Sequence, residues 1–158
     1  MFYKQIDTNQ QLNSDHACFD NEIALLKDNI LKNYGIDMKV NIRYSRKFTM
    51  VTMLDKEQPL PGDWQTEFQF RTCGVNNNGI FLKFIRLPKA KQRLGLGSYC
   101  VHWLEDWAQR FGYKYIVFSS KGTAQGFWYK MGYHCSEDPD FINELNPAVL
   151  KRQKTSRI

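Results

Sequence analysis

The order of elements in residues 80–131 is the feature that most restricts the fold. An apolar strand at 80–87 is followed by a basic loop with two glycines, a helix at 98–111, a short apolar strand at 115–118 and a helix at 124–131. When a helix connects two strands in this way, the strands become parallel neighbours in one sheet, because the helix carries the chain back to the end at which the first strand began. The order therefore favours a mixed, α/β-type sheet that is flanked by helices.

The sequence before residue 80 predicts a helix and then strands joined by polar turns. The helix begins after Asp20, which would cap it, and ends at Gly35. Connections rich in Pro, Gly and Asn separate the strands, which is typical of an antiparallel meander. The alternation of apolar and polar residues predicts strands at 38–44, 48–54 and 64–71. Residues 1–18 are polar and weakly patterned, so no element is expected there.

Spacing within the elements predicts which side chains share a face. The helical stripes are Ile23, Leu26, Ile30 and Tyr34 in the first helix and Val101, Leu104, Ala108 and Phe111 in the second. Along the strand at 80–87, alternation places four residues on one side, namely Ile80, Leu82, Phe84 and Arg86.

The length of 158 residues is that of one domain. We expect a single α+β domain over residues 1–158, in which the part at 1–78 precedes the β-α-β part at 79–135. A basic tail follows at 136–158, with a helix expected from Phe141 that frays at its end.

Charge and cysteine content narrow the classes of function. The formal charge of +6 and the pI of about 9.1 favour a polyanionic partner: nucleic acid, an anionic membrane surface or a phosphate-rich cofactor. The four cysteines and three histidines are scattered, so their spacing predicts no metal site and thiols that stay reduced. Residues 1–11 contain no apolar run that resembles a signal peptide, and the sequence has no run of about 20 apolar residues, so we expect a cytoplasmic protein with no membrane partner.

The loop at residues 89–98, KAKQRLGLGS, has the features of an anion site. The first backbone N–H groups of a helix have no partner within it, and the helix dipole adds partial positive charge. Gly95 and Gly97 leave the backbone open to a ligand, and Lys89, Lys91 and Arg93 add full charges. This combination suits a phosphate or a pyrophosphate. An ordinary tight turn with solvated lysines is the plainer alternative.

The two commonest nucleotide motifs do not fit this loop. The GxGxxG dinucleotide motif fails because Cys100 stands at the third glycine, and the GxxxxGK[ST] motif is absent. Binding of the NAD or ATP type is therefore a weak interpretation.

Two motifs, one on each side of the strand at 115–118, resemble the GNAT superfamily of acetyltransferases. The stretch QRLGLG at 92–97 is similar to the family's [Gln/Arg]-x-x-Gly-x-[Gly/Ala] signature between a strand and a helix. The stretch AQGFWYKMGY at 124–133 is similar to a second signature, an Ala-x-x-aromatic segment that ends in Gly-aromatic. The resemblance covers residues 80–133, about a third of the chain.

This resemblance implies a GNAT-like fold and an N-acetyltransferase that uses acetyl-CoA. It also implies an acceptor-side half at residues 1–78 and an acetyl-CoA-binding half at residues 79–135. In the family the strand before the loop pairs with the pantetheine amides, and the loop holds the pyrophosphate. A backbone N–H, here that of Leu87, would face the thioester oxygen and stabilise its charge. Trp128 would flank the cofactor, and Lys130 would reach a phosphate. The implied cofactor-binding residues are Ile85, Arg86, Leu87, Gln92, Arg93, Leu94, Gly95, Leu96, Gly97, Ser98, Trp128 and Lys130.

The catalytic groups stay open. Many GNAT enzymes have a tyrosine acid four residues before the glycine of the second motif, and here Trp128 takes that position. Tyr129 is the nearest phenol, but one residue is about 100° around a helix, and a packed aromatic is an equal interpretation. Glu67 on the preceding strand is the best candidate for the general base, with a solvated residue as the favoured alternative. His134 is a further candidate, and the serines at 119–120 would supply a polar contact or cap the next helix.

Three functions remain open at this point. The first is acetyl transfer to the primary amine of a small molecule or a protein. The second is a CoA-binding module without catalysis, motivated by Trp128 and by the absence of a carboxylate in the strand at 80–87. The third is association with nucleic acid or tRNA through the positive charge and the basic tail. After Tyr133 the chain departs from the strand-rich ending of the family, which leaves an altered acceptor cleft and a homodimer contact as interpretations.

Overall fold

The computed structural model describes residues 1–120 and 124–135. The basic tail and the helix expected from Phe141 lie outside the described residues. The strands are β1 (Phe2–Gln5), β2 (Met38–Tyr44), β3 (Thr49–Asp55), β4 (Glu67–Cys73), β5 (Gly79–Arg86), β6 (Tyr115–Phe118) and β7 (His134–Cys135). The helices are α1 (His16–Tyr34), α2 (Leu96–Phe111) and α3 (Gln125–Lys130), with short 3-10 turns η1 (Val75–Asn77) and η2 (Lys89–Lys91). Within these residues, no helix has the length and apolar content that crossing a bilayer requires.

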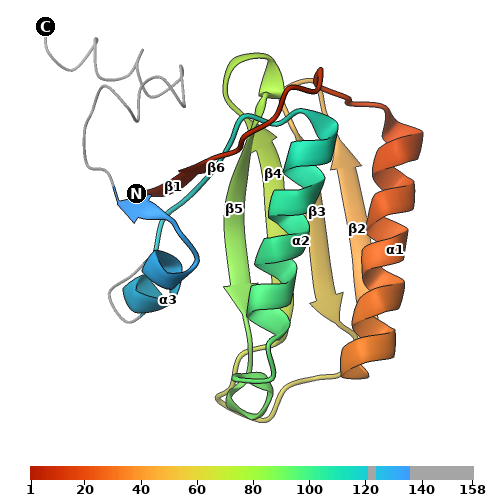
Figure 1. Cartoon of the computed structure of the whole chain (residues 1–158). Helices are drawn as coiled ribbons and strands as arrows, with labels where there is room; N and C mark the ends of the chain where they lie inside the picture. Colours follow the sequence, from red (N-terminus) through yellow and green to blue (C-terminus); the bar gives the residue numbers. More distant parts are fainter. Residues whose placement is uncertain (121–123, 136–158) are drawn as a thin grey trace, which may run out of the picture.

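The seven described strands form one mixed sheet with the order β2-β3-β4-β5-β6-β1-β7. Strands β2 to β5 are an antiparallel meander, and β5 pairs in parallel with β6 after the α2 crossover (Figure 1). The N-terminal strand β1 then lies antiparallel between β6 and β7. This arrangement confirms the predicted α+β class with a mixed sheet.

Helices α1 and α2 cover the same face of the sheet (Figure 1). They pack on each other where Phe19 meets Trp107 edge to face, with ring centroids 4.9 Å apart. At the solvent-exposed side of this contact, the Arg110 guanidinium donates to both carboxylate oxygens of Glu22, at 3.0 and 2.9 Å. The short helix α3 packs on the same side, because its Trp128 ring lies 4.0 Å from that of Phe118 in β6.

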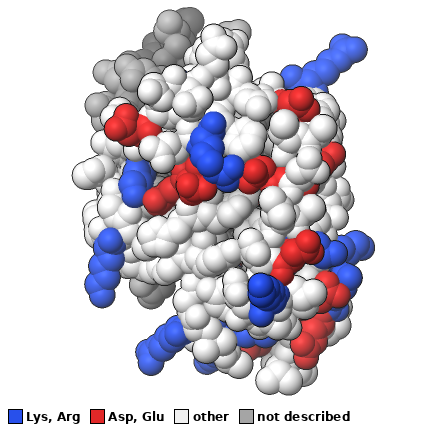
Figure 2. All heavy atoms as spheres, turned by 45° about the vertical axis from the view of Figure 1, so that its right-hand side comes forward, with Lys and Arg blue, Asp and Glu red and all other residues white. Residues whose placement is uncertain are grey.

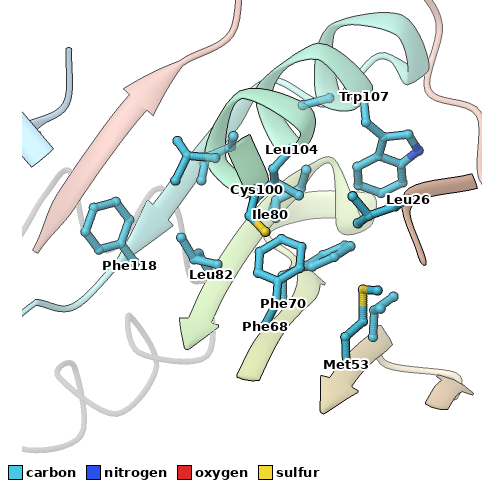
Figure 3. Close-up of a cluster of buried hydrophobic side chains, with 14 of the residues drawn as sticks. Leu26, Met53, Phe68, Phe70, Ile80, Leu82, Cys100, Leu104, Trp107 and Phe118 are labelled. Atoms are coloured by element: carbon cyan, nitrogen blue, oxygen red, sulfur yellow. The ribbon is translucent and has the colours of Figure 1, made fainter. Parts of the chain in front are cut away.

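The main hydrophobic core fills the space between this face and the two long helices (Figure 3). Leu26 of α1, together with Leu104 and Trp107 of α2, is completely buried. The labelled residues of the sheet beneath them are Met53, Phe68, Phe70, Ile80, Leu82 and Phe118. Each such side chain stabilises the fold by about 1.5–3 kcal/mol on burial. The core therefore holds the meander and the β5-α2-β6 unit together.

The first helix begins earlier than the sequence predicted, and its end is confirmed. Asp15, not Asp20, is the N-cap, and its carboxylate accepts a hydrogen bond from the N–H of Ala17 at 2.9 Å. The carboxylate of Asp20 instead accepts from the hydroxyl of Tyr44. At the other end Gly35 has a left-handed φ of 66°, and its N–H donates to the carbonyl of Leu31. Both aspartates suit a cap, so only the tertiary contact with β2 distinguishes them.

A β-bulge overturns the predicted alternation along β5. Gln69 pairs with Phe84 and Phe70 pairs with Leu82, so Lys83 is an extra residue in β5. Leu82 faces the helices before the bulge, and Ile85 packs on the core after it. Phe84 therefore does not share a face with Leu82, because the extra residue shifts the period-two pattern by one.

Two short strands and one strand start also differ from the prediction. No element was expected in residues 1–18, yet β1 pairs along its length with β6, and Phe2 is 1% exposed. The two-residue strand β7 pairs with β1. Strand β4 begins at Glu67 and not at residue 64, because Trp64 lies in the irregular segment before the paired residues and is 58% exposed. Strands as short as β1 and β7 have too few residues to show a periodic signal.

Candidate functional site

A cleft opens where the parallel strands β5 and β6 diverge. The two strands pair only between residues 79–81 and 115–117, and then separate (Figure 1). The cleft has a volume of about 860 Å³, which is within the usual size of a cofactor pocket. Its described lining consists of Trp64, Leu82, Lys83, Phe84, Ile85, Arg86, Leu87, Gln92, Arg93, Gly95, Gly97, Ser98, Phe118, Ser119, Ser120, Ala124, Phe127 and Trp128.

The bulge at Lys83 lies where the two strands part. Bulges bend a strand and increase its local twist, so this one turns the end of β5 away from the direction of β6. Beyond Phe81, the described residues form no pair between β5 and β6. The main chain of β5 therefore presents an open strand edge to the cleft. Such an edge binds extended ligands that carry amide groups.

The walls of the cleft are apolar and aromatic. Trp128 is 8% exposed and packs on Phe118, so α3 is fixed against the end of β6. At the mouth, the Arg86 guanidinium lies 4.8 Å from the centroid of the Trp64 ring and 3.9 Å from that of Phe84. A ligand would therefore bury apolar surface inside the cleft and meet a positive charge at its mouth.

The glycine loop, residues 89–98, forms one end of the cleft at the N-terminus of α2. Gly95 has a φ of 86°, a left-handed conformation that favours glycine, and no side chain caps the helix. Arg93 also has a positive φ, of 68°, which is uncommon outside glycine. The first helical hydrogen bond runs from the Tyr99 N–H to the Gly95 carbonyl. The N–H groups that precede it lie outside the helical ladder and can bind an anion.

Side chains tie this loop to the rest of the sheet. The Gln92 amide donates to the Leu87 carbonyl at 3.0 Å and closes the loop on itself. The Lys91 ammonium lies 2.6 Å from the carboxylate of Asp55, a residue of β3 that is 5% exposed. The sequence predicted Lys91 as a free charge for a phosphate, but its charge is offset by Asp55. Arg93 is exposed and lines the cleft, so it keeps the predicted position.

Nine of the twelve predicted cofactor-binding residues line the cleft. They are Ile85, Arg86, Leu87, Gln92, Arg93, Gly95, Gly97, Ser98 and Trp128. The other three lie elsewhere. Leu96 is 3% exposed and belongs to the core, because it falls on the apolar stripe of α2. Leu94 is exposed, and Lys130 is exposed on α3.

The predicted catalytic residues do not line the cleft. Tyr129 is 54% exposed, and its ring contacts Phe2 at 5.5 Å between centroids. Glu67 lies 3.8 Å from the Arg86 guanidinium, on the face of the sheet away from the helices. His134 is exposed beside the ring of Tyr3. Among the described residues that line the cleft, none is a carboxylate, an imidazole, a phenol or a thiol.

Sequence reasoning found Trp128 but missed other aromatic residues of the lining. Trp64 lies in the segment before β4, Phe118 ends β6, and Phe127 is on α3, so the three come from separate segments. The serines at 119–120, which the sequence offered for a polar contact, do line the cleft. The rule that ligands bind at the carboxyl ends of parallel strands would have indicated Phe118 as well. Trp64 was predicted only as the start of the strand at 64–71, and alternation along a strand does not show which residue borders a cleft.

Comparisons with known proteins add no assignment to this geometry, since no protein-family model matches the chain and a search of curated proteins finds no significant match. A metal centre has no support in residues 1–120 and 124–135, where no group of three His, Cys, Asp or Glu residues could hold an ion.

Proposed function

We propose that this chain binds acetyl-CoA in the β5–β6 cleft and transfers the acetyl group to a primary amine. The observation that carries the proposal is that an open strand edge and a glycine-bearing helix N-terminus meet in one cleft. A linear ligand with amides at one end and a diphosphate at the other needs this combination. The two GNAT-like motifs flank the same cleft, which further supports the proposal.

The described residues fit such a ligand part by part. The main chain of Ile85 to Leu87 would pair with the pantetheine amides, and the N–H groups from Gly95 to Ser98 would hold the diphosphate. A Cβ on Gly97 would lie 3.7 Å from a methyl carbon of Leu87, so a small side chain fits there and a large one would fill the cradle. Arg93 would add a full positive charge, while Phe118 and Trp128 would cover the apolar arm.

For acetyl transfer, the protein must position an amine next to the thioester. The amine must also lose a proton, and the departing thiolate must gain one. When bound, acetyl-CoA would supply the acetyl group in activated form, as a thioester. A main-chain N–H of β5 near Leu87 would stabilise negative charge on the carbonyl oxygen. The lining supplies hydroxyls at Ser98, Ser119 and Ser120. In the absence of a lining carboxylate or phenol among the described residues, water would take the proton from the amine. Water would also protonate the CoA thiolate that leaves when the C–S bond of the thioester breaks.

The test is a thiol-release assay with acetyl-CoA and a panel of primary amines, together with calorimetric binding of CoA. We expect CoA to bind at a single site and at least one amine to release free thiol. A folded protein that shows no heat of binding with CoA would contradict the whole proposal.

A CoA-binding module without transfer is the second candidate. The exposed position of Tyr129 and the lack of titratable acids or bases in the described lining favour it. The same two measurements separate the candidates, because a module would bind CoA and release no thiol with any amine of the panel.

A further inference from the structure

The two faces of the sheet differ in cover and in charge. Helices α1 and α2 carry five carboxylates and three Lys or Arg residues between them. Figure 2 looks toward α1 and shows acidic and basic side chains next to one another on that side. The opposite face of β2 to β5 carries no described helix, and its central residues are partly exposed or exposed. Its charged residues are Lys39, Arg43, Arg71, Lys83, Arg86 and Glu67.

We call this surface the basic sheet face. It holds five positive charges against one negative charge, and the Glu67 carboxylate lies 3.8 Å from Arg86. The chain as a whole has a net charge of +6. Much of that excess is therefore concentrated on one side of one sheet. A surface of this sign attracts polyanions and raises their local concentration.

Strand register arranges the face in three rows. The first row is Arg43, Met50, Arg71 and Phe81, the second is Asn41, Thr52, Gln69 and Phe84, and the third is Lys39, Leu54, Glu67 and Arg86. Neighbouring strands lie about 4.8 Å apart, so each row is a continuous line of side chains. The outer rows carry four of the five positive charges, and the bulge residue Lys83 belongs to no row. The middle row carries two amides, a hydroxyl and the Phe84 ring. Charge therefore flanks a line of hydrogen-bonding groups.

Cations on this face lie against aromatic rings. The Arg71 guanidinium is 5.3 Å from the ring centroid of Phe48 and 5.2 Å from that of Phe81. The Lys83 ammonium is 5.9 Å from the Phe84 ring, which also contacts Arg86. Guanidinium planes and aromatic rings are the two surfaces on which unpaired nucleobases stack. Phosphates, in turn, bind the same arginines and lysines.

We infer that the basic sheet face binds single-stranded nucleic acid. Backbone phosphates contact the outer rows, bases stack on the Arg71 and Phe84 end, and the amides of Asn41 and Gln69 meet base edges. A duplex fits less well, because its bases are stacked inside and cannot reach the rings. This inference does not depend on acetyl-CoA. It can fail while the proposed function holds, and the proposed function can fail while this inference holds.

The experiment is fluorescence anisotropy of a labelled single-stranded oligonucleotide over a series of potassium chloride concentrations. The test variant is Arg43→Gln with Lys83→Gln, which removes two exposed charges from the face. The matched control is Lys27→Gln with Lys32→Gln on α1, which removes the same charge from the helix side. Thermal unfolding of both variants checks that they fold.

We expect the parent to bind with an affinity that falls steeply with salt. The slope of log K against log salt is negative, and each lost phosphate contact makes it less steep by about 0.7. The slope of the face variant should therefore be less steep than that of the parent by about 1.4, and the slope of the control should not change. An abasic oligonucleotide of the same length should bind about tenfold or more weakly, because it cannot stack. The inference would be overturned if both variants lost the same affinity for the oligonucleotide. It would also be overturned if polyglutamate displaced the labelled oligonucleotide as effectively as unlabelled oligonucleotide does.

Discussion

Gly97 is the residue at which the proposed cofactor site is best tested. Gly95 has a φ of 86°, so any replacement there strains the loop in addition to blocking a ligand. Gly97 has no such conformation, and its Cβ would meet only ordinary contacts with Leu87 and Ile85. A substitution at Gly97 therefore changes the cleft more than the backbone.

Gly97→Glu should weaken CoA binding by about tenfold or more, because its carboxylate would repel the diphosphate. Two like charges about 4 Å apart repel by about 1 kcal/mol in water and by about 4 kcal/mol in a partly buried site. Gly97→Ala should keep the binding, since a methyl group fits. Calorimetry with CoA measures both. Ala24→Glu on the exposed side of α1 makes the same charge change as the glutamate variant. If it weakens binding as much as Gly97→Glu does, the loop is not the site.

The buried thiols give a prediction of reactivity. Burial raises the pKa of Cys73 to about 11 and that of Cys100 to about 12, whereas Cys135 is exposed. Only the thiolate reacts, so maleimide labelling near neutral pH should modify Cys135 first and leave the two buried thiols intact until unfolding. Peptide mass mapping over time checks the order. Rapid modification of Cys100 in the folded protein would contradict its place in the core.

The same shifts have a defined effect on stability. Thiols ionise above about pH 8.5 in an unfolded chain, but Cys73 and Cys100 stay protonated in the folded one. Their contribution is therefore present below about pH 8.5 and is lost as pH rises toward 11–12.

Among the elements, η2 and the end of β3 are joined by the Asp55–Lys91 ion pair. The Asp55 carboxylate also accepts from the N–H of Glu57 at 2.9 Å, so it anchors two loops at once. Gln65 donates to the main-chain carbonyl of the same aspartate at 2.7 Å. The path of the glycine loop therefore depends on a residue far from it in the sequence.

Asp55→Asn should destabilise the fold by about 1–3 kcal/mol, because it leaves the Lys91 charge without its partner in a partly buried position. It should also weaken CoA binding, since the loop loses its anchor. The control is Asp37→Asn, which breaks the exposed Lys56–Asp37 pair and should cost less than about 1 kcal/mol. Urea denaturation and CoA calorimetry on both variants measure the two effects. Unchanged CoA affinity in folded Asp55→Asn would show that the pair does not position the loop.

At the scale of the whole molecule, the sheet separates three environments. The helix-covered face holds the core, the divergence of β5 and β6 holds the cleft, and the open face holds the positive charge. Trp64, Phe84 and Arg86 lie at the boundary between the cleft and the basic sheet face. A molecule held on that face would lie next to the mouth of the cleft.

The sequence by itself determined the order of elements, the apolar stripes of the two long helices and the glycine loop at the start of α2. These features are local, because hydrophobic period, turn residues and caps act over a few neighbouring residues. Ile23, Leu26 and Ile30 are buried as their spacing predicts, and Gly35 ends the first helix. The glycines and charges of the loop at 89–98 are local features as well, whereas Ile85, Arg86 and Leu87 were expected in the site only from the resemblance of two motifs to a known family.

Only the tertiary structure decided the contacts between distant segments. Strand β1 has no pattern of its own, and its place beside β6 comes from main-chain pairing and from Phe2 packing on Phe118. The bulge at Lys83, the pairing of Lys91 with Asp55 and the exposed position of Tyr129 have the same origin. Each depends on which strand or loop lies opposite, and that is set by the packing of the complete sheet and not by neighbours along the chain.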